Sequence, residues 1–320
     1  MRRGNSYRHT AGYGGAMAEW DPDFTIDQPL VRALLAEQFP ELDAASARLL
    51  GEGWDNSVWM VEERWAFRFP RREIAIPRVR RELDVLPRLA PLLPVPIPVP
   101  RFVGMPSDRF PWPFFGASFI PGREPADAAL TPDDRAELGT ALGRFLRVLH
   151  APQMHASVDP ESQLPVDPLG RADMSKRVPM ARQFLADVQL AGIGRVPSSV
   201  LLDDASQLAP PAHAHAVFLH GDLHLRHVLV DNGSLAAVID WGDTCIGDPC
   251  IDLQIAWSLL PAEGRDKLLA EYGPVDEERQ LRARVLAVSL CSMLAKYAHS
   301  VGHASLEREA FEGVERALFD

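Results

Sequence analysis

Acidic and imidazole side chains flank a predicted hairpin in the C-terminal half of the sequence. Two apolar runs, residues 228–230 and 235–239, are separated by an Asp-Asn-Gly turn. An Asn-Gly pair between β-branched runs is the strongest short hairpin signal that a sequence offers. Because a hairpin brings its two outer ends together, we expect Asp222, His227 and Asp240 to converge in space.

These residue types in this order are what phosphoryl transfer requires. One carboxylate would accept the proton of an attacking hydroxyl, and the other groups would hold Mg²⁺, which neutralises the phosphates of a nucleotide. The alternative interpretation is that the three residues only cap the turns at the ends of the hairpin.

The elements upstream of the hairpin are those that must position a nucleotide. Alternation over residues 65–69 predicts a strand with Arg68 on the face opposite the aromatic side chains. Arg68 is permanently charged and can bind two phosphate oxygens, and Glu82 on the next predicted helix is its expected ion-pair partner. Asn56 replaces a third glycine, since Asn tolerates positive φ. The loop expected to cover the nucleotide carries Gly51, Gly53, Asn56 and Ser57.

The pattern changes after Pro121-Gly122, and we place a domain boundary there. Residues 18–122 are rich in predicted strands and residues 123–320 in predicted helices, which indicates an α+β fold of two domains. Residues 151–172 are predicted to be a loop. Helices in the second domain are predicted over residues 132–149, 174–191, 198–208, 251–260, 264–272 and 277–301.

Composition bounds the classes of function. The 320 residues contain 33 Lys plus Arg and 44 Asp plus Glu, a net charge of −11, which argues against nucleic acid or an anionic membrane as the main partner. The three cysteines have no paired spacing, so a reducing cytoplasm is expected. No apolar run is long enough to span a bilayer. Residues 1–17 are predicted to be a disordered tail, with Met1 and Met17 both candidates for the natural start.

Three motifs of the C-terminal half together resemble those of a known family. They are His-Gly-Asp-Leu-His at 220–224, Ile-Asp-Trp-Gly-Asp at 239–243 and Gly-Asp-Pro-x-x-Asp at 247–252. Together they resemble the aminoglycoside phosphotransferase family, the antibiotic-kinase branch of the protein-kinase-like fold. The resemblance implies a small antiparallel-sheet N-lobe over a larger helical C-lobe. It also implies an enzyme that transfers a phosphoryl group from ATP or GTP to a small-molecule hydroxyl. An aminoglycoside, a macrolide or a metabolite alcohol, cationic or not, would fit as acceptor.

The resemblance also assigns roles to individual residues. Asp222 is implied to be the catalytic base, and His220 is implied to support its loop. His227 and Asp240 occupy the metal-ligand positions, and Asp252 is implied to lie buried beneath the loop.

Two residues depart from the family pattern. His227 stands where Asn is usual, although the macrolide phosphotransferases are similar in carrying His, and Mg²⁺ prefers oxygen ligands. Arg68 stands where most relatives have Lys. These departures keep open a second hypothesis, a nucleotide-binding pseudokinase that scaffolds a partner.

A third hypothesis is a metal-dependent hydrolase. His220, His224 and His227 would then bind zinc together with Asp222. Asp243 and Asp248 are expected to cap the turns that follow them, or else to assist a metal. A group of C-terminal acids would meet a polycationic substrate or form a solvated helix surface. These acids are Glu263, Asp266, Glu271, Asp276, Glu277 and Glu278.

Overall fold

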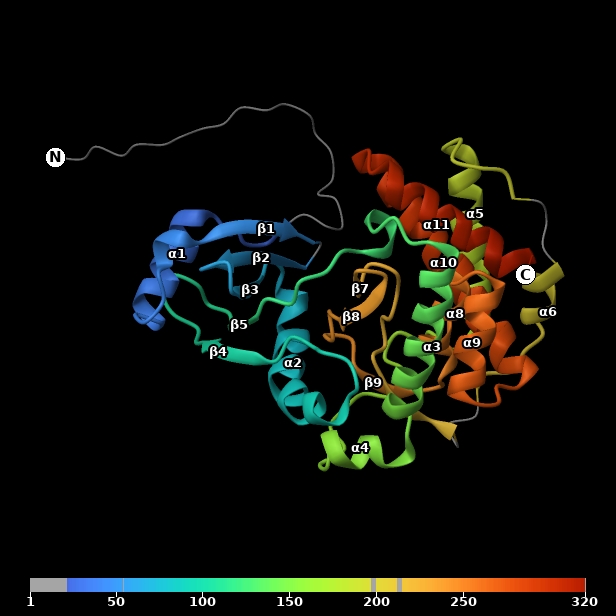
Figure 1. Cartoon of the computed structure of the whole chain (residues 1–320), viewed down its shortest axis with the longest axis horizontal. Helices are drawn as coiled ribbons and strands as arrows, with labels where there is room; N and C mark the ends of the chain where they lie inside the picture. Colours follow the sequence, from blue (N-terminus) through green and yellow to red (C-terminus); the bar gives the residue numbers. More distant parts are fainter. Residues whose placement is uncertain (1–21, 54, 197–199, 212–214, 320) are drawn as a thin grey trace.

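The computed structural model describes residues 22–53, 55–196, 200–211 and 215–319. They form two lobes, a smaller one built on a sheet and a larger one built mostly of helices (Figure 1). The predicted tail over residues 1–17 lies outside the described residues. The predicted boundary at residue 122 falls in the connection between the last strand of the sheet and the helices of the larger lobe.

The N-terminal lobe is a five-stranded antiparallel sheet with a helix packed on each face. The alternation in the third strand explains this layering, because Phe67 and Phe69 face one helix while Arg68 faces the other. The helices are α1 (Gln28–Gln38) and α2 (Ile76–Leu89). The strands are β1 (Arg48–Glu52), β2 (Asn56–Val61), β3 (Trp65–Pro70), β4 (Pro100–Gly104) and β5 (Phe114–Ser118), in the order β1-β2-β3-β5-β4.

The C-terminal lobe is built around two long helices. The first, α3, begins after Thr131, which forms a reciprocal capping box with Asp134. The long helix α10 packs against α5 and α11. The helices are α3 (Pro132–Leu149), α4 (Pro152–Val158), α5 (Met174–Leu190), α6 (Val200–Ala205), α7 (Cys250–Leu253), α8 (Ile255–Ser258), α9 (Ala262–Tyr272), α10 (Glu277–Val301) and α11 (Ala304–Phe319).

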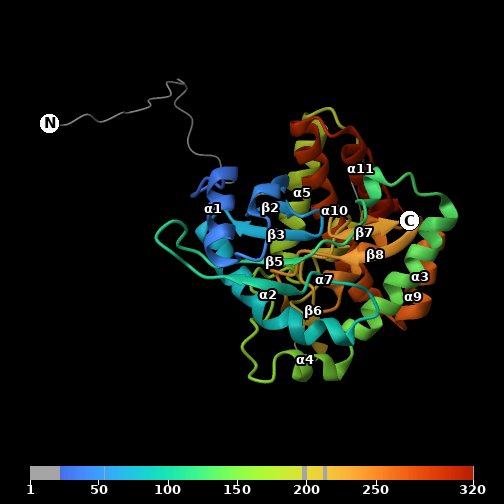
Figure 2. The same ribbon diagram turned by 60° about the vertical axis from the view of Figure 1, so that its left-hand side comes forward.

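The predicted hairpin is confirmed. Strands β7 (Val228–Asp231) and β8 (Ser234–Val238) pair antiparallel around the Asn-Gly turn, and Val228 lies opposite Val238. A second small sheet joins β6 (Val217–Leu219) to β9 (Cys245–Gly247). Both views place the hairpin between the five-stranded sheet and the C-terminal helices (Figures 1 and 2).

Two expectations for the helical lobe were wrong in part, and one helix was missed. The segment 151–172, predicted to be a loop, contains α4, which begins at Pro152, a residue favoured at the first helical position. The helix predicted over 251–260 is two short helices, α7 and α8. Helix α11 was not predicted, although its apolar side chains recur at helical spacing.

Two properties of the described residues bear on later sections. None of their helices is both long and apolar enough to cross a bilayer. The three cysteines are free and buried, and burial raises the pKa of Cys245 and of Cys291 to about 12.

Candidate active site

The structure confirms that the three flanking residues converge. His227 lies between two carboxylates, with Nδ1 3.8 Å from Oδ2 of Asp222 and Nε2 3.5 Å from Oδ2 of Asp240. The backbone N–H of Ile239 donates to the carbonyl of His227 at 2.9 Å, which continues the hairpin pairing beyond its strands. The outer ends of the hairpin therefore hold all three side chains at one place.

The loop before the hairpin is anchored from below by a buried acid. Asp252 accepts hydrogen bonds from the backbone N–H groups of His220 at 2.8 Å and Gly221 at 2.9 Å. Gly221 has φ +85°, and a Cβ there would lie 2.1 Å from the carbonyl oxygen of Asp243. Only glycine fits this position, since both the conformation and the space exclude a side chain.

His220 is fully buried and braces the same loop. Its Nε2 lies 3.0 Å from the carbonyl oxygen of Ile239, and its Nδ1 lies 3.2 Å from the backbone N–H of Asp222. A neutral ring protonated at Nε2 satisfies both contacts, donating to the first and accepting from the second. Burial lowers the pKa of His220, which favours the neutral form of the ring.

Arg68 connects the two lobes at the site. Its guanidinium donates to Glu82 Oε1 at 2.9 Å, which confirms the expected partner, and to Asp240 Oδ1 at 2.8 Å. With its amide oxygen turned toward Arg68, the orientation that satisfies both groups, Asn56 accepts from Nη2 at 2.8 Å and Nε at 3.2 Å. Glu82 also accepts from the backbone N–H of Trp241 at 3.1 Å.

The pKa values of the two acids beside Arg68 are shifted in opposite directions. Burial raises the pKa of Glu82 to about 7, although Arg68 pulls it down. Burial alone would raise the pKa of Asp240 as well, but Arg68 outweighs it and holds that pKa below the ordinary value. Asp240 also has φ +63°, an uncommon conformation outside glycine that concentrates at functional sites.

The glycine loop differs from the expectation. Gly53 and Asn56 line the cleft between the lobes, and Asp55, which was not predicted, lines it with them. Asn56 is not among the positive-φ residues of the described chain, so it does not take the conformation expected of a third glycine. Its side-chain amide contacts Arg68 instead. Gly51 lies in the exposed strand β1 outside the cleft lining, and the buried Ser57 accepts a hydrogen bond from Trp59.

Two arginines that bind aspartates of the cleft were missed by the sequence analysis. Arg171, from the segment before α5, donates to Asp222 at 3.0 Å and to Asp243 at 2.8 Å. Arg78 on α2 donates to the other oxygen of Asp243 at 2.7 Å. Asp243 is thus an ion-pair partner of two arginines instead of a turn cap. Asp248 accepts a hydrogen bond from the N–H of Cys250 in the turn before α7, as expected, and also pairs with Arg279 at 3.0 Å.

The cleft has a volume of about 560 Å³ and two kinds of wall. An apolar slot between the sheet and the hairpin is lined by Val58, Ala66, Ala117, Leu229 and Ile239. Helix α10 contributes a second apolar wall, which consists of Leu290, Met293, Leu294 and Tyr297.

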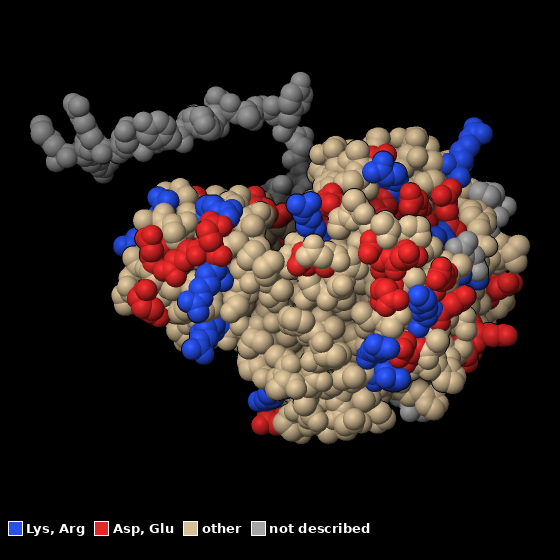
Figure 3. Space-filling view, viewed as in Figure 1, with Lys and Arg blue, Asp and Glu red and all other residues tan. Residues whose placement is uncertain are grey.

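The predicted C-terminal acids do not reach this cleft. None of the six is among its described lining residues, and Glu271 pairs instead with Arg144 at 2.8 Å. On the face shown in Figure 3, acidic side chains are interspersed with basic ones over both lobes. A solvated helix surface describes these acids better than a binding surface for a polycation.

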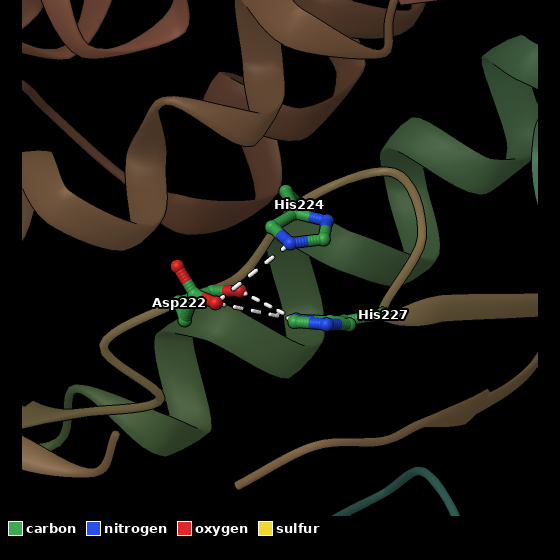
Figure 4. Close-up of side chains that lie close together, drawn as sticks. All are labelled: Asp222, His224 and His227. Carbon is green, nitrogen blue, oxygen red and sulfur yellow. Dashed lines mark hydrogen bonds and ion pairs between the residues drawn. The ribbon is translucent and has the colours of Figure 1, made fainter. Parts of the chain in front are cut away.

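Three donor groups gather closely enough to hold a metal ion. Ligand atoms of Asp222, His224 and His227 all lie within 4.8 Å of one another. Figure 4 shows both imidazoles beside the carboxylate, and the two rings stack with centroids 3.7 Å apart. His220 is not among them, because its ring contacts Ile239 and Trp241, so the four-ligand zinc site of the hydrolase hypothesis is not formed.

Comparisons with known proteins show a family and a fold to which this chain is similar. Residues 46–286 match the family model described as the phosphotransferase enzyme family. Uncharacterized protein YcbJ of Bacillus subtilis (strain 168) is 27% identical over 104 residues, which are 31% of this chain and 32% of that protein. The match therefore spans about a third of that relative's length.

Solved structures share the fold at low identity. The GDP complex of wild-type aminoglycoside 2'-phosphotransferase-IIIa is 21% identical with a TM-score of 0.65, and the alignment covers 91% of this chain and 98% of that one. Macrolide 2'-phosphotransferase MphH from Brachybacterium faecium is 23% identical with a TM-score of 0.57, covering 90% and 97%. These similarities confirm the two-lobed kinase-like fold.

Proposed function

This chain belongs to the phosphotransferase enzyme family, and from that premise we propose that it is a small-molecule kinase. It transfers the γ-phosphoryl group of ATP or GTP to a hydroxyl of its acceptor. The observation that carries the proposal is the cleft in which Asp222, Asp240 and Arg68 lie together, with Arg68 bonded to Asp240 at 2.8 Å.

The proposed reaction is a direct transfer. The acceptor oxygen forms a bond to the γ-phosphorus while the bond from that phosphorus to the β–γ bridging oxygen breaks, and the hydroxyl proton passes to Asp222. Asp222 orients the hydroxyl as well as receiving its proton. His220 supports this geometry by holding the backbone on which Asp222 stands.

The nucleotide would lie between the lobes. Its base enters the apolar slot between β2, β3, β5 and the hairpin, where burial of a flat ring is favourable. Arg68 faces the phosphates and is kept in place by Glu82 and Asn56. Gly53 and Asn56 line the cleft and would contact the nucleotide directly. Gly51 and Ser57 do not line it, so they would contribute to nucleotide binding by shaping the backbone of the covering loop.

The residues fit a magnesium ion that is shared with the nucleotide. Mg²⁺ usually takes one or two protein carboxylates and completes its shell with phosphate oxygens and water. Asp240 supplies such a carboxylate, facing the cleft with 42% of its side chain exposed. When bound, the ion would neutralise charge on the phosphates. His227 lies close to the carboxylate of Asp240 but offers a nitrogen ligand, whereas Mg²⁺ prefers oxygen. We therefore propose that His227 would contact the ion through a bridging water molecule.

The acceptor is proposed to carry a large apolar face. The wall formed by α10 is apolar, and Glu124, one of the acids that line the cleft, is paired with Arg226 at 3.1 Å. This favours a macrolide or another apolar alcohol over a polycationic aminoglycoside. We also keep the proposals of a cytoplasmic location and of no nucleic-acid or membrane partner, which rest on composition.

The test is transfer of labelled phosphate from ATP and from GTP to a panel of aminoglycosides, macrolides and simple apolar alcohols. Wild type should label at least one acceptor, and Asp222→Asn should lower kcat by at least about 100-fold. Asp240→Asn should abolish Mg²⁺-dependent transfer, while Asp203→Asn, on the exposed surface of α6, should retain it. Nucleotide binding without any transfer would instead support the pseudokinase hypothesis.

A further inference from the structure

Four ion pairs form a continuous chain across the cleft. Asp55 of the glycine loop pairs with Arg78 of α2, and Arg78 Nε lies 2.7 Å from Asp243 Oδ1. The other oxygen of Asp243 lies 2.8 Å from Arg171, and the same nitrogen of Arg171 lies 3.0 Å from Oδ1 of Asp222. The chain therefore runs from the nucleotide-covering loop to the proposed base.

These four ion pairs are better shielded from solvent than an ordinary surface ion pair. Only 17% of the Arg171 side chain and 17% of the Asp243 side chain are exposed. Burial alone would raise the pKa of Asp243, yet Arg171 and Arg78 hold it below its ordinary value, so this carboxylate is charged between two cations. Interactions in this position are screened less by solvent than exposed pairs are.

The segment that carries Arg171 is held by hydrogen bonds of its own, independently of the four ion pairs. The carboxylate of Asp167 accepts hydrogen bonds from the backbone N–H of Arg171 at 2.7 Å and of Ala172 at 2.9 Å. Arg177 donates to the carbonyls of Leu169 at 2.5 Å and Gly170 at 3.2 Å. The backbone of Arg171 is thus fixed before its side chain meets Asp222.

Arg171 contacts only one of the two carboxylate oxygens of Asp222. Oδ1 is held by the guanidinium, while Oδ2 faces His224 at 3.7 Å and His227 at 3.8 Å. A carboxylate with one oxygen bound to a fixed cation keeps one orientation, which leaves its other oxygen for the acceptor hydroxyl.

We propose that Arg171 is a positioning residue that sets the orientation of Asp222, and that Asp243 is the shared anchor through which this orientation is coupled to the glycine loop. The inference rests on the proposed kinase function for its kinetic consequence. Its structural consequence, the coupling of loop 219–224 to loop 51–56, is independent of the reaction.

The kinetic test compares Arg171→Gln and Arg171→Lys with Arg182→Gln, a control on the exposed surface of α5. Arg171→Gln should lower kcat about 10- to 100-fold and leave KM for the nucleotide within about twofold, because it disturbs orientation and not nucleotide binding. Lys should restore part of kcat. A wild-type kcat in Arg171→Gln, or an equal loss in Arg182→Gln, would overturn the proposal.

The second test needs no nucleotide and no acceptor. Hydrogen–deuterium exchange of the free protein should rise in residues 219–224 for Arg171→Gln, and in both 219–224 and 51–56 for Asp243→Asn, while Arg182→Gln changes neither. Unchanged exchange in both loops of Asp243→Asn would overturn the coupling. If wild type transfers no phosphate, the proposed function fails, and this measurement still decides the coupling by itself.

Discussion

Asp252 and Gly221 are joined by a hydrogen bond of 2.9 Å from the backbone N–H of Gly221 to Oδ1 of Asp252. Asp252 is fully buried in α7 of the helical lobe, and Gly221 precedes the proposed base. The loop that carries Asp222 is therefore fixed to the helical lobe through its backbone, and two of its properties can be tested by substitution.

The first prediction concerns the space at Gly221. We expect Gly221→Ala to lower the free energy of unfolding by about 2–5 kcal/mol, because the new methyl adds a clash with the Asp243 carbonyl to the cost of a positive φ. Gly192→Ala is the matched control, since φ there is +73° but no atom lies within 4 Å of the new Cβ. It should cost only about 1–2 kcal/mol. Urea unfolding measures both, and equal losses would contradict the close approach.

The second prediction concerns pH. Burial lowers the pKa of His220 below its ordinary 6.5, so below pH 6.5 the unfolded chain binds a proton that the folded chain refuses. The stability that His220 contributes is present above pH 6.5 and is lost as pH falls. We expect the free energy of unfolding to fall by up to about 1.4 kcal/mol per pH unit from this residue. Urea unfolding between pH 7 and 5 should show a shallower slope in His220→Asn; an unchanged slope would refute the assignment.

The third prediction concerns Arg68. Lys carries the same charge but cannot hold Glu82, Asp240 and Asn56 together, because it lacks the planar fork. We expect Arg68→Lys to weaken ATP or GTP binding about tenfold, as the loss of one charge-assisted hydrogen bond implies. Calorimetric titration measures the affinity. Arg64→Lys, which removes a guanidinium from above Trp65 outside the cleft, should bind normally; a parallel loss in both variants would argue against a specific role.

The fourth prediction concerns the acceptor wall. Met293 lines the cleft from α10. A carboxylate at this position would lose its hydration when an apolar acceptor binds, which weakens the binding of that acceptor. We expect Met293→Glu to raise KM for an apolar alcohol at least about tenfold, with little change in KM for the nucleotide. Met105→Glu, at a side chain that is 64% exposed in the N-terminal lobe, is the control. Steady-state kinetics separate the two constants, and improved use of an apolar acceptor in Met293→Glu would be contrary evidence.

Local pattern explains why much of this site was predictable. The hairpin is specified by a turn and two adjacent runs, so Asp222, His227 and Asp240 converge by short-range geometry. Arg68 and Glu82 are only 14 residues apart, on a strand and the helix that follows it.

The two missed arginines bind aspartates that lie far along the chain. Arg171 meets Asp222 from 51 positions away and Asp243 from 72, and Arg78 meets Asp243 from 165. Arg171 stands in an irregular segment that has no hydrophobic period to fix its direction. Tertiary packing, and no local signal, brings these charges together.

The buried thiols make this chain a convenient host for spectroscopic labels. With burial raising the pKa of Cys245 and Cys291 to about 12, neither supplies the thiolate that maleimides attack at neutral pH, and burial raises the pKa of Cys250 as well. We therefore expect the native protein to remain unlabelled, as intact-mass spectrometry would show. Cysteines introduced at the exposed Asp108 and Glu315 would then report the distance between the two lobes, with no native cysteine to remove.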